Sequence, residues 1–393
     1  MKRRGGIAIA SVAVVAAALA STAGAGSTAA AKTQAVSCKS TLKIGFTAPF
    51  TGGAGFLGNE QLSWAKYAAK TLAPKYGLKI KLITGDTPVE QGPAIAQTIA
   101  QKFIADKTVV AVLGPSTSGN VVASSQAFFD AGLAHISPSA TRTALTKGLT
   151  KSATPAFFRV VPGDYIQGPS DANFMIKKGA KKVVLFDFQE PYSQGLSDAA
   201  EIVLKAKGVS VTRLSVANTV TDYASFVTKV GSDVDFVFFP TQKPGDAQNI
   251  AQQLIEQGKK AKVFGGDGSN DATQFKVPGS FVSNFAPDIS GFAYNKAVIA
   301  GWKADNPGKS LGSFGPPAYL ATQVALNAIK KACDLGNGQI KDRRDVVRNV
   351  KKILVKNSIL GGDFRFSTKS NDPLNAKFYI FEIQKDGSYK LVG

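Results

Sequence analysis

The chain contains few of the side chains that build metal centres and nucleophilic active sites. Its 393 residues include two cysteines, one histidine, two methionines and two tryptophans. A structural zinc site takes about four cysteine or histidine ligands, so this composition argues against one. The chain also lacks a phosphate-binding loop, and "GPSTSG" departs from G-x-S-x-G because Ser118 stands where the last glycine belongs. We therefore expect no metal, no cofactor and no nucleophilic catalysis.

Two other arrangements of titratable groups have both a catalytic and a structural interpretation. His135 stands in the apolar stretch "LAHISP", which favours a packed strand residue over a general base. Asp267 and Glu190 could form the carboxylate pair of a glycoside hydrolase, but they belong to different loops and no motif fixes their separation. The sequence therefore favours a protein that is not an enzyme.

Long apolar runs are missing except at the start of the chain. A basic beginning at 2–4 precedes the apolar stretch 7–20, which has signal-peptide length and is short for a membrane span. Small residues follow, so we expect a signal peptide over 1–31 with cleavage after Ala25 or Ala31. The pattern predicts export to the periplasm or to the outer face of the cytoplasmic membrane or cell wall.

Acidic residues are scarce relative to basic ones, and the formal net charge is +20. Such a balance suits a nucleic-acid or anionic-surface partner. Here, however, the lysines are spread over many predicted helices and no arginine-rich run occurs, which is typical of a solvated surface. Export also argues against nucleic acid, so we expect no nucleic-acid partner.

The two cysteines, Cys38 and Cys333, leave three possibilities open. Export permits a disulfide between them, which would join the amino-terminal end to a late helix over 318–333. They could also be two separate thiols. Alternatively, "AVSC" loosely resembles a lipidation motif, although residues 32–34 separate it from the apolar stretch that such a motif adjoins.

Predicted strands and helices alternate along the chain, which indicates parallel sheets with crossover helices. The alternation occurs in two successive runs. The first run has strands at 41–48, 78–86, 109–115 and 133–138, with helices at 59–77, 90–106 and 119–132. The second has helices at 165–180, 192–208, 223–232 and 244–259, with strands at 181–188, 209–216, 233–240 and 260–268. The fold class is therefore α/β, with two doubly wound lobes facing each other.

The loops after the strands are rich in Gly, Ser, Thr and Pro. In open α/β sheets, ligands bind beyond the carboxyl ends of the strands, near the point where the strand order reverses. Six loops therefore define one predicted ligand cleft between the lobes: 48–59, 114–120, 137–141, 187–195, 239–246 and 265–271.

Seven segments at these positions resemble the substrate-binding proteins of ABC importers for leucine, isoleucine and valine. They are "IGFTAPFTG", "VAVLGPSTSG", "AHISPSATRTALT", "FRVVPGDYIQGP", "VVLFDFQEPYSQGL", "DFVFFP" and "VFGGDGSND". The resemblance runs from about residue 41 to 393, and the order and spacing of the segments make it specific. It implies the type I periplasmic-binding-protein fold and capture of an amino acid.

The resemblance also implies roles for individual residues. Ser118 would donate its hydroxyl to the ligand's α-carboxylate, and Thr141 would hold both the carboxylate and the α-ammonium. Ser139, beside Ala140 in the turn "SPSAT", would offer its backbone carbonyl to the ammonium. Asp267 stands where the family usually has an acidic residue that pairs with the ammonium. The chemistry agrees, because a helix predicted to begin at Ser118 favours a carboxylate and a carboxylate suits an ammonium.

Three larger side chains complete the predicted site. Phe56 and Tyr192 stand where aromatic residues pack on the ligand or close over it in the family. Gln242 stands where the family commonly has an aromatic residue, often tyrosine. This departure, together with an aspartate at Asp267 in place of a longer acidic residue, opens the prediction to an amide or a small polar amino acid. A short amide or an aromatic acid is also compatible with the family.

The fold implied by the resemblance has discontinuous lobes. The first lobe would contain 41–162 and 288–373, and the second 163–287 and 374–393, with a three-stranded hinge near 162, 287 and 374. Closure of the second lobe on a captured ligand would present it, as a monomer, to a membrane permease. A ligand sensor of the same fold is the alternative. A repressor would need a DNA-binding headpiece where this chain has its signal peptide.

Overall fold

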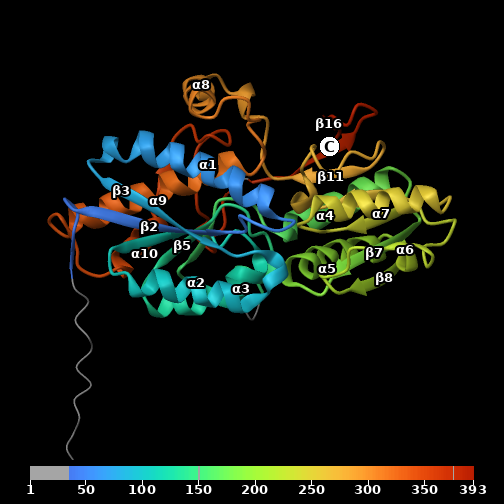
Figure 1. Ribbon diagram of the computed structural model, residues 1–393, viewed down its shortest axis with the longest axis horizontal. Coiled ribbons are helices and arrows are strands. Elements are labelled where there is room, and N and C mark those ends of the chain that lie inside the picture. Colours follow the sequence, from blue (N-terminus) through green and yellow to red (C-terminus); the bar gives the residue numbers. More distant parts are fainter. Residues whose placement is uncertain (1–34, 149–150, 375) are drawn as a thin grey trace, which may run out of the picture. The chain divides into compact units, whose positions relative to one another are not determined.

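A computed structural model describes residues 35–148, 151–374 and 376–393. The predicted signal peptide therefore lies outside the described residues. Two sheets organise this part of the chain (Figure 1). The first has five parallel strands in the order β3 (Lys79–Asp86), β2 (Thr41–Ala48), β4 (Val109–Leu113), β5 (Ala134–Ser137) and β6 (Phe157–Arg159). All five residues of β4 are buried, as expected for a central strand covered on both faces.

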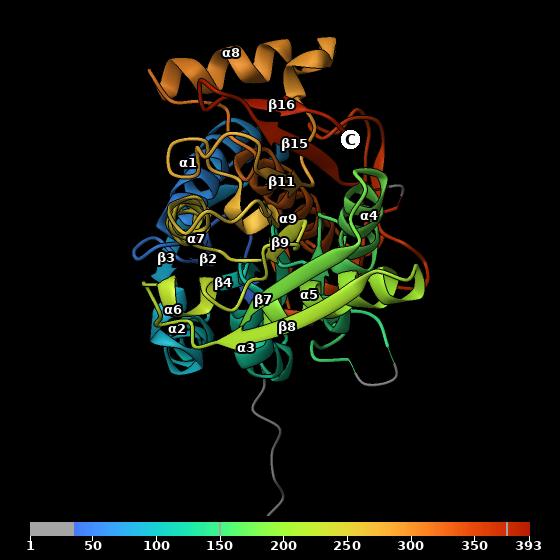
Figure 2. The same ribbon diagram turned by 90° about the vertical axis from the view of Figure 1, so that its right-hand side faces the viewer.

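The second sheet has seven strands and is mixed. Its order is β16 (Tyr389–Leu391), β15 (Tyr379–Ile383), β11 (Phe281–Asn284), β10 (Lys262–Gly265), β9 (Phe236–Phe239), β7 (Lys182–Phe188) and β8 (Ser210–Val216). The strands from β8 to β11 are parallel, and Figure 2 shows β7 and β8 side by side. The last two strands in the chain, β15 and β16, pair antiparallel, which the sequence did not predict.

Helices cover both faces of the first sheet. On one face lie α1 (Gly55–Leu72), α9 (Gly315–Leu335) and α10 (Arg344–Val350), and on the other lie α2 (Pro93–Ala105) and α3 (Ser118–Asp130) (Figure 1). α1 buries Leu57, Trp64, Ala68 and Leu72, a spacing that puts them on one side of a helix. Trp64 stacks on Trp302 of α8 (Lys296–Asp305), with ring centroids 4.6 Å apart.

The second sheet is covered in the same way. One apolar cluster joins it to α4 (Asp164–Lys177) and α5 (Pro191–Ala206), and another joins it to α6 (Ala224–Val227) and α7 (Pro244–Glu256). The helix expected over 223–232 is much shorter than predicted, since α6 has four residues. Gly231 and Ser232 follow it and favour a turn over a longer helix.

The strand orders place one reversal point in each sheet. In the first sheet the chain leaves β2 for β3 on one side and then returns to β4 on the other, and β7 has the same relation to β8 and β9. Ligands bind beyond the carboxyl ends of strands at such points. The chain passes between the two sheets three times, after β6, after β11 and before β15.

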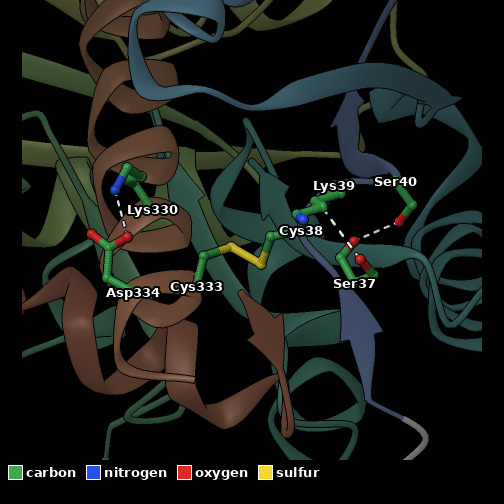
Figure 3. The surroundings of a disulfide bond; sticks show 7 residues. All are labelled: Ser37, Cys38, Lys39, Ser40, Lys330, Cys333 and Asp334. Atoms are coloured by element: carbon green, nitrogen blue, oxygen red, sulfur yellow. Dashed lines mark hydrogen bonds and ion pairs between the residues drawn. A yellow bond between two sulfur atoms is a disulfide. The ribbon is translucent and has the colours of Figure 1, made fainter. Parts of the chain in front are cut away.

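A disulfide joins Cys38 to Cys333 of α9, with the Cα atoms 6.0 Å apart (Figure 3). The pairing confirms the first of the three alternatives for the cysteines and makes the Cys38 sulfur unavailable for a lipid. Next to it, the short strand β1 (Val36–Ser37) pairs antiparallel with β12 (Gln339–Ile340). A two-stranded pair of β13 (Leu354–Val355) and β14 (Phe364–Arg365) completes the described strands.

No helix among the described residues is both long and apolar enough to cross a membrane.

Candidate functional site

The turn "SPSAT" follows β5 and is fixed by its own hydroxyl groups. Ser137 Oγ donates to the carbonyl of Pro115 at 2.7 Å and accepts from the backbone N–H of Ala140 at 2.9 Å. Ser139 Oγ donates to the carbonyl of Ser116 at 2.5 Å and accepts from the side-chain amide of Gln61 at 2.8 Å. These bonds tie the turn to the loop after β4, which ends the neighbouring strand of the same sheet.

Arg159, at the end of β6, fixes the turn by hydrogen bonds to its carbonyl groups. Its Nη1 donates to the carbonyls of Thr141 at 2.7 Å and Arg142 at 2.9 Å, and its Nε donates to Asp372 at 2.7 Å. The side chains of Arg159 and Asp372 are 0% and 1% exposed. The hydrogen bonds to a carboxylate and to backbone carbonyls satisfy the guanidinium although it is buried. The turn carbonyls are therefore fixed by a rigid ion pair.

The amino terminus of α3 lies beside the same turn. The Ser118 hydroxyl, on the first residue of α3, accepts from the backbone N–H of Arg142 at 3.2 Å. The first N–H groups of a helix have no partner inside the helix and carry the positive end of its dipole. Ser118 and Thr141 thus border a position that favours a small anion such as a carboxylate.

Tyr192 and Asp267 form the corresponding part of the second sheet. Tyr192 lies in the first turn of α5, and Asp267 begins the short turn η4 (Asp267–Ser269) after β10. The Tyr192 hydroxyl donates to Asp267 Oδ1 at 2.9 Å and accepts from the N–H of Gly268 at 3.1 Å. Gly266 permits this approach, because a Cβ there would collide with the Tyr192 hydroxyl and lie 2.7 Å from Leu196.

One face of α4 adds three polar side chains, Asp164, Gln167 and Asp171, at helical spacing. All three are fully buried. Gln167 Nε2 donates to the hydroxyl of Ser283 at 2.9 Å, and Ser283 donates to Asp171 Oδ2 at 3.0 Å. Asp164 is held at its backbone, where its N–H donates to the carbonyl of Thr141 at 2.8 Å. The α4 face therefore connects the turn after β5 to the second sheet.

Several buried oxygen atoms at this place have no hydrogen-bond partner among the described residues. They are Thr141 Oγ1, both carboxylate oxygens of Asp164, Gln167 Oε1 and Asp171 Oδ1. Leaving a buried polar atom unpaired costs about 1–3 kcal/mol. Apart from the Thr141 hydroxyl these atoms can act only as acceptors when the carboxyls are ionised. When ionised, the Asp164 carboxylate has the Thr141 hydroxyl as a nearby donor, which lowers the pKa of Asp164, but it needs further donors, and a cation meets that need best.

The carboxyl groups are correspondingly hard to ionise. Burial, and then the charge of Asp267, raise the pKa of Asp164 to about 8. Burial raises the pKa of Asp267 to about 6, and the hydrogen bond from Tyr192 opposes that rise. The pKa of Asp171 is raised well above its usual value, again mainly by burial. A bound cation would favour the ionised form of each group.

Comparison with known proteins identifies the family. The family model described as periplasmic binding protein matches residues 41–388. The chain belongs to the periplasmic binding protein family. The Leu/Ile/Val-binding protein homolog 1 of Brucella suis is 27% identical over 364 residues, which are 89% of this chain and 92% of that protein. The family resemblance read from the sequence is therefore confirmed.

Two solved structures share the fold of this periplasmic binding protein. A leucine binding protein, LivK, from Thermotoga maritima superposes with a TM-score of 0.79 at 21% identity, covering 90% of this chain and 98% of that one. A solute binding protein of an ABC transporter from R. palustris, in complex with benzoate, superposes with a TM-score of 0.77 at 19% identity, covering 90% and 96%. The predicted two-lobed α/β fold is thus confirmed.

The structure of this periplasmic binding protein brings together most of the residues that the sequence singled out. Ser118, Ser139, Ala140 and Thr141 meet around one turn, and all are at most 5% exposed. Tyr192 and Asp267 are bonded to each other in the second sheet. Gln242 follows β9 and lines a neighbouring cavity with Thr117 and Gln189.

Phe56 does not join this group. Its ring packs edge-on against Phe314 at 5.6 Å, and it lines a separate groove with Asn270 and Ser313. Glu190 caps α5, since its carboxylate accepts from the N–H groups of Tyr192 and Ser193 at 2.9 and 2.7 Å. This is a structural role for the residue that was considered above as half of a catalytic carboxylate pair.

His135 is a packed strand residue. It is 0% exposed, and its ring lies between those of Phe128 and Phe157, with centroids 5.4 and 5.6 Å away. Burial lowers the pKa of His135 to about 4, so the imidazole is neutral near pH 7. The environment matches the structural interpretation drawn from the sequence.

Sequence reasoning missed Arg159, Asp164, Gln167 and Asp372 as parts of the site. A signal was present for the first two, because "FRVVPGD" puts an arginine and an aspartate at the ends of an apolar segment. Charged groups in such a segment are rarely buried without a partner. Asp372 lies 213 residues from Arg159, and no local pattern marks that pairing.

Proposed function

We propose that the chain is an extracytoplasmic solute-binding protein of an ABC importer, which captures a free amino acid. The observation that carries this proposal is the group of unpaired buried acceptors, Thr141 Oγ1 and the Asp164 carboxylate, beside Asp267. An α-ammonium has three donors and a positive charge, which these atoms lack. The neighbouring amino terminus of α3, with Ser118, suits the α-carboxylate of the same molecule.

Capture would proceed by lobe closure. We assign 41–162 and 288–373 to the first lobe and 163–287 and 374–393 to the second, with hinge segments near 162, 287 and 374. Sheet membership supports this division, because β2 to β6 fall in the first set of ranges and β7 to β11 with β15 and β16 in the second. The ammonium would be shared between Thr141 of the first lobe and Asp267 of the second, so binding would favour the closed form.

The names of the relatives support the proposed class of ligand. The Brucella suis protein carries the name Leu/Ile/Val-binding protein homolog, and LivK is described as a leucine binding protein. A basic segment followed by an apolar one at 2–20 supports export. The partners would be the transmembrane permease subunits of the importer, and the chain would act as a monomer without enzymatic activity.

The R. palustris complex favours a second candidate, an importer component for an aromatic acid. Benzoate has a carboxylate for the α3 terminus but no cation for Asp164 and Asp267. The two candidates therefore differ in which variants affect binding. A ligand sensor of the same fold would bind the same molecules without a permease, and capture by purified permease subunits distinguishes it.

The test is calorimetric titration of the ligand-stripped protein with leucine, isoleucine, valine, alanine, phenylalanine, glutamine, urea and benzoate. We expect tight binding of at least one α-amino acid and its loss, by roughly 30-fold or more, in Asp267→Asn and Ser118→Ala, because a buried charge loses its partner. Lys296→Met on the far helix α8 is the control. Binding of benzoate alone, unaffected by Asp267→Asn, would establish the second candidate instead.

A further inference from the structure

A cavity of about 310 Å³ lies next to the proposed amino-acid site. Its lining includes Thr117 and Gly119, which flank Ser118, and Gln242, which follows β9. The volume is at the lower end of the roughly 300–1,000 Å³ of small-molecule sites. Because the cavity adjoins Ser118, we infer that a ligand whose carboxylate rests on the start of α3 extends its side chain into this space.

The charged side chain that lines the cavity already has hydrogen-bond partners within the protein. Glu190 is the one charged residue among those that line it, and both of its oxygens accept backbone N–H groups at the start of α5. No lysine or arginine is among the lining residues. A side chain ending in a carboxylate would find no cation here, and one ending in an ammonium would find no free carboxylate. The lining thus selects against charged side chains.

Four carboxamides line the cavity, from four different segments. Asn120 donates to the carbonyl of Thr87 at 3.1 Å, and Asn218 donates to that of Val89 at 3.4 Å. Gln189 and Gln242 form no side-chain hydrogen bond with the described residues, and Gln242 is only 9% exposed. The Gln242 amide atoms are not among the fully buried atoms that lack a partner, so its two donors and its acceptor are accessible to a ligand in the cavity.

The remaining lining is apolar and small. It consists of Val89, Pro93, Val122, Ala123 and Pro191 with the glycines Gly92 and Gly119. Such a surface accommodates the methylene groups of a ligand side chain, while Gln242 can form hydrogen bonds with a polar group at its end. The combination suits a side chain with an apolar stem and an uncharged polar end.

We propose that this cavity selects an amino acid with an uncharged, hydrogen-bonding side chain of the carboxamide type, and that Gln242 is the main determinant of that choice. The inference rests on the proposed function, because the carboxylate and ammonium fix the ligand's direction. It differs from the aliphatic specificity that the names of the relatives would transfer. A site built to pair an amide rejects an apolar analogue of the same length strongly, since its own amide is then left unpaired.

The experiment is titration of the ligand-stripped protein with glutamine, methionine and glutamate. These three have side chains of similar length that end in an amide, an apolar group or a charge. We expect glutamine to bind at least tenfold more tightly than methionine, and glutamate more weakly than both. Tighter binding of methionine, or of leucine, would overturn the inference and leave the proposed function standing. Failure of every α-amino acid to bind would overturn both.

A matched pair of variants locates the selectivity. Gln242→Leu keeps the approximate size and removes the amide, and we expect it to weaken glutamine binding at least tenfold and to bring methionine close to glutamine. Gln252→Leu, at an exposed position of α7, is the control and should leave both affinities unchanged. If Gln242→Leu retains the full preference for glutamine, Gln242 is not the determinant and the inference fails.

Discussion

Arg159 and Asp372 are 213 residues apart in the chain, yet Arg159 Nε donates to Asp372 Oδ1 at 2.7 Å in the interior. The Thr146 hydroxyl donates to the same carboxylate at 2.8 Å. Although burial opposes ionisation, the Arg159 guanidinium and these bonds hold the pKa of Asp372 below its usual value. Because Arg159 also donates to the carbonyls of Thr141 and Arg142, the position of the turn after β5 depends on Asp372, a residue near the far end of the chain.

Removing one partner of this pair should therefore be costly. We expect Arg159→Met and Asp372→Asn each to lower the free energy of unfolding by about 3–5 kcal/mol, because the remaining charge is buried without its partner. Urea unfolding of the ligand-free protein measures this. The exposed pair Lys70–Asp305 also joins distant segments, and Lys70→Met should cost less than about 1 kcal/mol. Equal costs for the two pairs would contradict the prediction.

The strands and helices up to β10, apart from β1 and β6, could be predicted because they are periodic and bounded by turn residues; β11 was not expected either. β4 and β9 could be predicted as strands because every residue in them is apolar, and in the structure all of these residues are buried. The added antiparallel strands β15 and β16 could not be predicted in the same way. The register of β15 depends on its pairing with β11, almost a hundred residues earlier, and a sequence pattern does not encode such a partner; β16 then pairs with β15.

The residues of the candidate site also divide into those that the sequence predicted and those that it did not. Ser118, Thr141 and Asp267 could be predicted as candidates because each lies shortly after a strand of the expected fold. Ser118 begins the helix after β4, Thr141 is in the turn after β5, and Asp267 follows β10. Asp164 and Gln167 lie instead on a helix, where polar residues usually indicate a solvated face. Only the three-dimensional packing of α4 shows that this face is buried. Phe56 was expected to cover the ligand, but the nearby Phe314 offers its ring a packing partner.

Amino-acid affinity should rise with pH if an ammonium binds the ionised carboxyl groups. In the free protein the pKa of Asp267 is raised to about 6 and that of Asp164 to about 8, so protons must leave on binding. We expect the affinity to rise roughly tenfold per pH unit between pH 6 and 8, and more steeply below pH 6. Titration in two buffers of different ionisation enthalpy would count the released protons. A flat pH profile would contradict the proposed ammonium site.

The stability of the ligand-free protein should change in the opposite direction. A carboxyl whose pKa is raised on folding contributes stability below its unfolded pKa and loses that contribution as pH rises through the folded value. For Asp164 this window extends from about pH 4 to about pH 8. The Tm of the ligand-free protein should therefore fall between these pH values. Asp164→Asn should reduce this fall and raise the Tm at pH 8. The same variant should bind the ligand more weakly. A lower Tm for Asp164→Asn at pH 8 would contradict this.

The disulfide should contribute to stability without acting on the ligand. It spans 295 residues, and chain-entropy arguments give about 5–6 kcal/mol as the upper limit for a loop of this length. We expect the double variant Cys38→Ser with Cys333→Ser to unfold at lower urea, with a loss of about 2–5 kcal/mol, and to keep its ligand affinity within about twofold. Alkylation and intact mass, before and after reduction, should show two protected thiols in the native protein. Free thiols without reduction would contradict the bridge.

Gly266 should be essential for the position of Tyr192 rather than for the backbone. Its φ of −75° is accessible to alanine, so Gly266→Ala introduces no backbone strain. The new methyl group would instead meet the Tyr192 hydroxyl and Leu196, and would push Tyr192 away from Asp267. We expect a loss of ligand affinity of roughly tenfold or more, with the folded state retained. Gly245→Ala, whose Cβ would find no atom closer than 4.0 Å, is the matched control.

The mechanism of that loss can be separated from general damage by a second substitution. Tyr192→Phe removes the hydroxyl with which the methyl group collides and also the hydrogen bond to Asp267. Residues that share one contact show strongly non-additive effects. Gly266→Ala should therefore cost much less affinity in the Tyr192→Phe background than in the native protein. Additive losses would mean that Gly266 acts through Leu196 or the β10 backbone, and the assignment of Tyr192 as the group it positions would be wrong.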